Sequence, residues 1–261
     1  VMIVMALAMS LFTGVSARAE QPVISEDLTT TCTVYSGTNE NAQNYIIWSS
    51  PVKSYLESAG DRLMRVQAGI SGMSDYLVEY YDRNYNLLST KAVEQELNLF
   101  GGFYSDGSYY YILSGQNNPN EKNNREVMRI TQYDTGWNRL GAASLYGANT
   151  YIPFDAGSAR FAKDGKYLLI RTCHEMYKSD DGYHHQDNMT SQVDTQEMQV
   201  TDCYSDIMNV NYGYVSHSFN QFIQVEDHKI VALDHGDALP RSFNLCLYKT
   251  DVSRGTFTPV Y

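Results

Sequence analysis

Positive charge is scarce in this chain of 261 residues. It has 19 lysine and arginine residues against 30 aspartate and glutamate residues, which gives a formal net charge of −11. No cluster of lysine or arginine stands out along the sequence. Proteins that bind nucleic acid or anionic membranes without sequence preference need a basic patch that neutralises phosphate groups. We therefore expect no nucleic-acid partner.

Cysteine is also rare, and the four cysteines are widely spaced at Cys32, Cys173, Cys203 and Cys246. The absence of a CxxC pair removes support for a zinc site of that type. Cys173 and Cys203 lie on either side of one insertion and could be linked by a disulfide. Four separately buried thiols would fit equally well, because a free cysteine behaves as a small apolar residue. The sequence leaves the disulfide pairing open.

Several motifs that hold cofactors or nucleophiles are missing. The chain has no GxGxxG, no GxxxxGK[ST] and no GxSxG, which are typical of dinucleotide sites, phosphate loops and the nucleophile elbow of hydrolases. It also lacks HExxH and the complete calcium-loop pattern of an EF-hand. We therefore predict no cofactor and no metal site.

Long apolar runs are confined to the start of the sequence. "VMIVMALAMSLFTGVSARAE" carries no charge before Arg18 and ends in Ala17-Arg18-Ala19 before Glu20. A short apolar core followed by a small-x-small pattern is typical of a secretory signal peptide. We assign residues 1–19 to such a signal, and expect the sequence to begin inside it because a basic n-region is missing. The protein is predicted to be secreted or held at the cell surface, with no membrane span after cleavage.

Tyrosine, by contrast, is abundant, with 22 residues, and it occurs within repeated phrases. "LFGGFYSDGSYYYIL" (99–113) is echoed by "DAGSARFAKDGKYLLI" (155–170), and "YYDRNYNLLSTKAV" (80–93) by "QYDTGWNRLGAASL" (132–145). Asp-Gly between apolar runs is a strong hairpin signal. Helical patterns are scarce, and 41–58 is the best helix or loop candidate. The chain thus repeats a β-hairpin unit.

A repeating unit of about 40–50 residues that contains four short strands is typical of a propeller blade. We predict an all-β, β-propeller-like array of four-stranded blades, either complete or incomplete, with a β-sandwich as the alternative. Residues 20–59 are assigned to an N-terminal segment or a first partial blade. The repeats of 60–261 are placed at about 60–95, 99–148, 150–205 and 212–258.

Three variable loops occupy matching places in these units, at 114–127, 171–192 and 234–243. In a propeller such loops gather on one rim, and loops on a rigid scaffold are where sites are built. Five of the six histidines lie in or near them. The candidate ligand-binding residues of this rim are Arg171, His174, Glu175, His185, Gln186, His217, Asp234, His235, Asp237 and Arg241.

This pattern allows three functions. The protein could bind an extracellular glycan or protein through the rim, which the aromatic-rich composition favours. It could be a glycan-active hydrolase, in which Glu175 with Asp187 or Asp237 supplies paired carboxylates, or a lyase, in which His174 with Arg171 abstracts a proton. It could also be a structural adhesion spacer, in which these residues only tie loops together. We expect ligand binding.

The phrases "RTCHEMYKSDDGYHHQ", "YVSHSFNQFI" and "DHGDALPRS" resemble a family of exported bacterial β-propeller-like repeat proteins. The resemblance extends over most of residues 60–250. It implies an exported repeat fold but carries over no activity and no site residue, and a fold alone does not determine function.

The signal-peptide assignment makes a direct prediction. When the protein is exported by its native host, mass spectrometry of the mature N-terminus is expected to give Glu20 as the first residue. A secreted form that still carried residues 1–19 would contradict the assignment, and a variant with Ala17 and Ala19 changed to bulky residues should be processed poorly.

Overall fold

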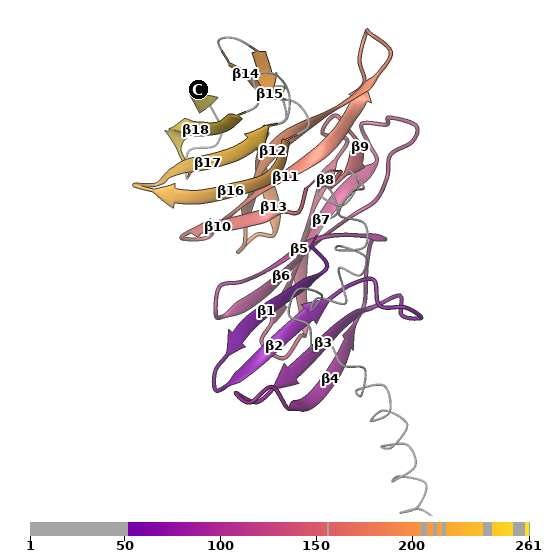
Figure 1. The fold of residues 1–261 in the computed structure, drawn as a ribbon, viewed down its shortest axis with the longest axis vertical. Helices are drawn as coiled ribbons and strands as arrows, with labels where there is room; N and C mark the ends of the chain where they lie inside the picture. Colours follow the sequence, from indigo (N-terminus) through magenta and orange to yellow (C-terminus); the bar gives the residue numbers. More distant parts are fainter. Residues whose placement is uncertain are drawn as a thin grey trace, which may run out of the picture.

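The computed structural model describes residues 52–155, 157–204, 208–210, 213–215, 218–236, 242–252 and 259–260. Across these ranges the chain is all-β, as predicted. Its strands form four antiparallel sheets and one short hairpin (Figure 1). In each of the four sheets, four strands lie side by side in sequence order, and the third sheet has one further strand, so the architecture is a β-propeller-like array of four-stranded sheets.

The first sheet consists of β1 (Ser54–Ala59), β2 (Arg62–Gln67), β3 (Tyr76–Tyr81) and β4 (Leu87–Val93). The second consists of β5 (Leu99–Ser105), β6 (Tyr109–Gly115), β7 (Glu126–Asp134) and β8 (Arg139–Tyr146). The third consists of β9 (Thr150–Pro153), β10 (Arg160–Asp164), β11 (Tyr167–Lys178), β12 (His184–Asp194) and β13 (Gln199–Tyr204). The fourth consists of β16 (Ser218–Glu226), β17 (Lys229–Gly236), β18 (Ser242–Asp251) and β19 (Pro259–Val260). The hairpin consists of β14 (Met208–Val210) and β15 (Gly213–Val215).

The first sheet begins earlier than the sequence suggested. Strand β1 starts at Ser54, inside the range 20–59 that we assigned to an N-terminal segment or partial blade. The segment 41–58, which we expected to be a helix or a loop, is therefore a strand from Ser54 onwards. Six β1 residues pair with β2, and this ladder overrides the weak helical pattern of the sequence.

The repeated Asp-Gly phrases occupy equivalent places in neighbouring sheets. Asp106-Gly107 follows the first strand of the second sheet, and Asp164-Gly165 joins the first two strands of the third. Asp227-His228 lies between the matching strands of the fourth. Gly107 and Gly165 have φ of 86° and 55°, which L-residues with a side chain rarely adopt. The hairpin recurs because the four-stranded sheet recurs.

The second repeated phrase is a turn that joins the last two strands of a sheet. The Asp82 carboxylate accepts hydrogen bonds from the backbone and side-chain nitrogens of Asn86, at 2.9 and 2.8 Å. Asp134 accepts the same two bonds from Asn138, each at 2.8 Å. An aspartate that bonds to the following backbone stabilises a turn locally. Two distant phrases thus encode one turn.

The sheets pack through their second strands. In β6, Tyr110 and Ile112 belong to the core shared with the first sheet, while Tyr111 and Leu113 belong to the core shared with the third. A strand covered on both faces reads as a continuous apolar run, because its alternating side chains are all buried. This explains why "YYIL" and "YLLI" show no polar alternation.

Trp137 joins the first two sheets. Its ring lies 4.8 Å from that of Tyr110 and 5.9 Å from that of Phe103, measured between centroids. Its indole Nε1 donates a hydrogen bond of 3.0 Å to the hydroxyl of Tyr80. A buried tryptophan whose N–H is satisfied adds a large apolar contact without a polar cost. The turn residue of one sheet is therefore a core residue of the interface with its neighbour.

Strand β9 is an extra strand of the third sheet. The end of β11 runs past β10, and there β9 pairs with it, with Pro153 opposite His174 and Ile152 opposite Glu175. The same part of β11 pairs with β12 on its other side. The projecting end of the third sheet is thus a three-stranded structure.

The outer face of the fourth sheet is apolar and open. Five large hydrophobic side chains of this sheet have at least about a third of their surface exposed: Phe222, Leu233, Phe243, Leu245 and Leu247. Paired positions such as Phe222 and Leu233, or Leu233 and Leu245, make this face continuous across the three strands.

Cys173, Cys203 and Cys246 are free thiols, and Cys32 lies outside the described residues. The disulfide between Cys173 and Cys203 that the sequence allowed is therefore not formed. Cys173 and Cys246 are fully buried between the third and fourth sheets, where they pack as small apolar residues. In the described ranges, no helix has the length and apolarity needed to cross a membrane.

Close packing between the second and third sheets gives a stability prediction. A Cβ at Gly101 would lie 2.5 Å from the Phe154 ring, whereas one at Gly141 would meet the flexible Met198 side chain at 2.9 Å. We expect Gly101→Ala to lower the free energy of unfolding by about 1–3 kcal/mol. Gly141→Ala is the control and should cost less, because methionine can move aside. Urea denaturation measures both, and equal losses would contradict this account of the interface.

Candidate functional site

Two variable loops of the second and third sheets lie against each other. The side-chain amide of Asn118 donates a hydrogen bond of 3.0 Å to the hydroxyl of Tyr177. The backbone nitrogen of Lys178 donates to the Glu121 carboxylate at 3.2 Å. These loops leave their sheets at matching places, so neighbouring sheets bring them to one end. We call the surface formed by residues 116–125, 149–155 and 175–186 the loop rim.

Aromatic rings mark the surface of the loop rim. The rings of Tyr151 and His184 are stacked, with centroids 3.9 Å apart. His184 Nδ1 donates a hydrogen bond of 2.7 Å to the carbonyl oxygen of Met176, and its Nε2 lies 3.6 Å from a carboxylate oxygen of Glu121. These contacts hold the imidazole in place. Tyr183, at the tip of the adjacent hairpin, is 71% exposed.

Carboxylates lie beside these rings. Glu175 on β11 is half-buried, and burial followed by the nearby Asp155 charge raises its pKa. Gln186 lies opposite Glu175 across the β11–β12 ladder and donates a hydrogen bond to Asp155. Two carboxylates, an amide and stacked aromatic rings therefore share one small region of the rim.

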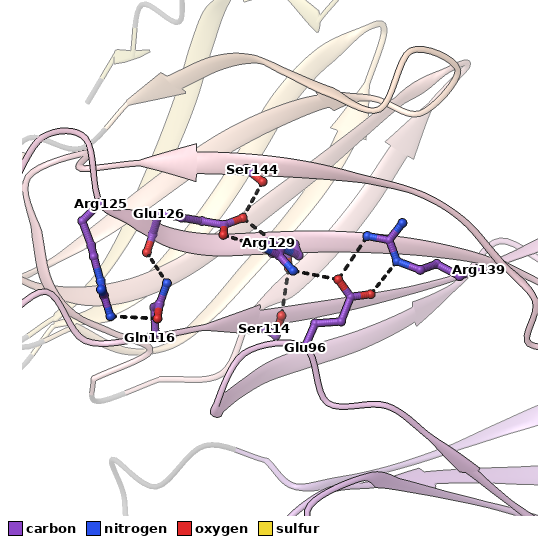
Figure 2. Close-up of polar contacts among 8 residues, drawn as sticks. All are labelled: Glu96, Ser114, Gln116, Arg125, Glu126, Arg129, Arg139 and Ser144. Carbon is purple, nitrogen blue, oxygen red and sulfur yellow. Dashed lines mark hydrogen bonds and ion pairs between the residues drawn. The ribbon is translucent and has the colours of Figure 1, made fainter.

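The base of the first loop is fixed by charged groups (Figure 2). Arg129 on β7 makes a bidentate ion pair with Glu126 and also contacts Glu96, which in turn pairs with Arg139. Burial raises the pKa of Glu96, but the hydrogen bonds from Arg139 and Arg129 outweigh it and the pKa is lowered. Gln116, at the start of the loop, donates to the Glu126 carbonyl oxygen at 2.9 Å. The loop therefore starts from a rigid platform.

Arg171 and Asp234, two of the predicted rim residues, form a buried ion pair instead. Both side chains are inaccessible to solvent, and the guanidinium Nε donates to Asp234 at 2.7 Å while a second nitrogen contacts the other carboxylate oxygen. Burial alone would lower the pKa of Arg171, but the charge of Asp234 raises it well above the usual value. Arg171 also donates to the hydroxyl of Tyr248 at 3.2 Å. This pair joins β11 to β17, between the third and fourth sheets.

His174 is also turned inwards. It is fully buried, and its Nδ1 is hydrogen-bonded to the Thr150 hydroxyl at 2.7 Å. Its Nε2 has no hydrogen-bond partner in the described part of the chain. Burial lowers its pKa to about 3, so the imidazole is neutral at physiological pH.

The remaining predicted residues divide between the rim and undescribed parts of the chain. His185 lies near the hairpin tip, where its Nε2 contacts the Asp181 carboxylate at 2.7 Å. His217, Asp237 and Arg241 lie outside the described residues, as does the side chain of His235. Two members of the predicted set, Arg171 and Asp234, are joined by side-chain hydrogen bonds, and two more, Glu175 and Gln186, lie opposite each other on β11 and β12.

Sequence reasoning missed Asn118, Glu121, Tyr151 and Asp155. Asn118 and Glu121 lie in the predicted loop 114–127, but without the histidine-rich context that directed attention to 171–192. Tyr151 lies in β9 and Asp155 just after it, outside all three predicted loops, because no pattern in the sequence indicated this extra strand. The described residues hold no group of three or more histidine, cysteine, aspartate or glutamate side chains that could ligate a metal. The described part of the rim brings together aromatic rings, an amide and carboxylates.

No protein-family model matches the chain, and no curated protein matches it. Among solved structures, a variant of Synechocystis apocarotenoid oxygenase is similar at 10% identity with a TM-score of 0.48. The cobalt-substituted form of that enzyme is similar at 9% identity with a TM-score of 0.46. Each similarity covers 80% of this chain and 49% of the other, so the chain spans about half the length of these proteins. At this score the likeness says nothing about what this chain binds.

The buried His174 predicts a pH effect. Its pKa is about 3 in the folded state, against 6.5 for an unperturbed histidine, so the unfolded chain binds an extra proton between these values. The contribution of neutral His174 to the free energy of unfolding is fully present above pH 6.5 and is lost as the pH falls towards 3. We expect His174→Gln to flatten this acid-side decline in urea denaturation.

His228 provides the control with the opposite sign. Its hydrogen bond to Asp164 raises its pKa, so its contribution is complete below pH 6.5 and is lost as the pH rises through the raised value. His228→Gln should leave the acid-side slope unchanged. A slope that is the same in wild type and His174→Gln would contradict the neutral, buried state of His174.

Proposed function

We propose that this is a secreted or cell-surface module that binds an extracellular glycan through the loop rim. The observation that carries the proposal is the joining of two loops into one surface that holds the exposed Tyr183 and the Tyr151–His184 stack. The apolar core and small-x-small ending of residues 1–19 support export. The function belongs to the loops, and the sheets hold them in register.

The chemistry of the rim suits a sugar. A pyranose ring has an apolar C–H face that packs on an aromatic ring, and hydroxyl groups that hydrogen-bond to carboxylates and amides. Tyr183 offers an exposed ring, and elsewhere on the rim Asp155 and Glu175 offer acceptors and Gln186 offers an amide. A protein ligand could use the same tyrosine as an anchor, and it is an outcome that the experiment distinguishes.

Glu175 also favours a second function, the cleavage of a bound glycan. A carboxyl group whose pKa is raised, next to another carboxylate, is the usual arrangement for a general acid in glycoside hydrolysis. In this case Glu175 would protonate the leaving oxygen, and Asp155 is the nearby carboxylate that could act as base or nucleophile. Product release that Glu175→Gln abolishes without loss of binding would establish cleavage.

The binding function is tested with a glycan array and with titration of any glycan that the array identifies. Replacing Tyr183 and His184 together by alanine removes the exposed ring and half of the stack. Because aromatic contacts contribute about 0.5–1.5 kcal/mol each beyond the area that they bury, we expect affinity to fall at least tenfold.

Tyr85→Ala is the matched control, because Tyr85 is a comparably exposed tyrosine (61%) in the turn between β3 and β4, away from the rim loops. It should bind as the wild type does. Unchanged binding in the double variant would show that the ligand does not bind at the loop rim. The ligand would instead be a protein if the wild type bound no glycan but bound a defined extracellular protein, and if the double variant lost that binding.

A further inference from the structure

A pocket lies at the end of the sheets opposite the loop rim. It is an open hollow of about 540 Å³ between the β5–β6 turn of the second sheet and the end of β10 in the third. Tyr104, Asp106, Ser108, Tyr109 and Lys163 are among its lining residues. These residues come from the repeated Asp-Gly hairpins, which the sequence indicated only as turns.

The two charges of the pocket neutralise each other. Lys163 donates a short hydrogen bond to Asp106, and its ammonium also lies 3.4 Å from the Tyr111 hydroxyl. The other oxygen of Asp106 accepts the backbone nitrogens of Ser108 and Tyr109 at 2.9 and 2.7 Å. Burial raises the pKa of Asp106, but the hydrogen bond from Lys163 outweighs it and the pKa is lowered. A charged ligand would have to disrupt this pair, so the pocket suits a neutral ligand.

Three hydroxyl groups around this pair remain open to a ligand. The hydroxyls of Tyr104, Ser108 and Tyr109 form no hydrogen bond with the described part of the chain. The Tyr104 ring is held by stacking on Phe161, with centroids 5.7 Å apart. Tyr109 is 40% exposed and offers an aromatic surface. The site therefore combines a fixed ring, an accessible ring and several hydroxyl donors and acceptors.

We propose that this pocket is a second binding site, separate from the loop rim, which takes a neutral saccharide. A neutral sugar matches the three features together, because its C–H face packs on tyrosine, its hydroxyls pair with hydroxyls, and it carries no charge to disturb Asp106 and Lys163. The volume of the hollow is within the range of small-molecule sites.

The test records ¹H–¹⁵N spectra of the full chain during titration with cellohexaose, maltohexaose and chitohexaose. We expect at least one of these sugars to produce saturable shifts of the amides of Ser108, Tyr109 and Gly165. In Tyr109→Ala the affinity should fall about tenfold, because an aromatic contact is removed. Ser108→Trp replaces an exposed side chain with a bulky ring that fills the hollow, and should abolish the shifts while the rest of the spectrum stays folded.

Tyr146→Ala is the matched control, since Tyr146 is an exposed tyrosine of the same sheet that does not line the pocket. It should leave the affinity unchanged. Absence of saturable shifts with all three sugars, or wild-type affinity in Ser108→Trp, would overturn the proposal. Rim variants such as Tyr183→Ala should not alter these shifts. The proposal for the pocket can therefore fail while the proposal for the loop rim holds, and the reverse.

Discussion

The fold depends on one constraint: a four-stranded sheet whose central strands are apolar on both faces must be covered on both. Tyr110 and Ile112 face one neighbour and Tyr111 and Leu113 face the other, so the second sheet is stable only between two others. The third sheet repeats this arrangement, with Ile170 and Leu169 in different cores. The fourth sheet is also apolar on the face that carries Leu233, Phe243 and Leu245, and there these side chains are exposed. Figure 1 shows the sheets in their order.

Sheet stacking also separates the two ends of the molecule. The turns at one end are short and are stabilised by their own aspartates, as with Asp82 and Asp134. The connections at the other end are longer, and they contact one another through Asn118 and Glu121. Within this chain the loops of the rim therefore differ from sheet to sheet, whereas the Asp-based turns at the other end are repeated. The pocket beside Asp106 shows that two repeated turns from adjacent sheets can still form a hollow between them.

The sequence predicted the elements that are determined locally. Asp-Gly and Tyr-Asp phrases determine turns through positive φ and side-chain-to-backbone bonds, so their recurrence was sufficient to predict an all-β array of four-stranded sheets. It could not show which residues of β11 face a neighbouring sheet. Arg171 and His174 were expected at a ligand site, but both are buried, because β11 lies within the sheet stack over most of its length. Burial of a polar strand residue depends on distant partners such as Asp234 and Thr150, which local patterns do not reveal.

The extra strand β9 has a consequence for recognition. By pairing with the projecting end of β11 opposite β12, it turns what would be a free two-stranded hairpin into a three-stranded support beneath Glu175 and His184. Two-stranded ribbons are marginally stable in water, and a ligand that ordered one would lose part of its binding free energy in doing so. A support that is already ordered avoids that entropic loss, which favours the binding that we propose for the loop rim.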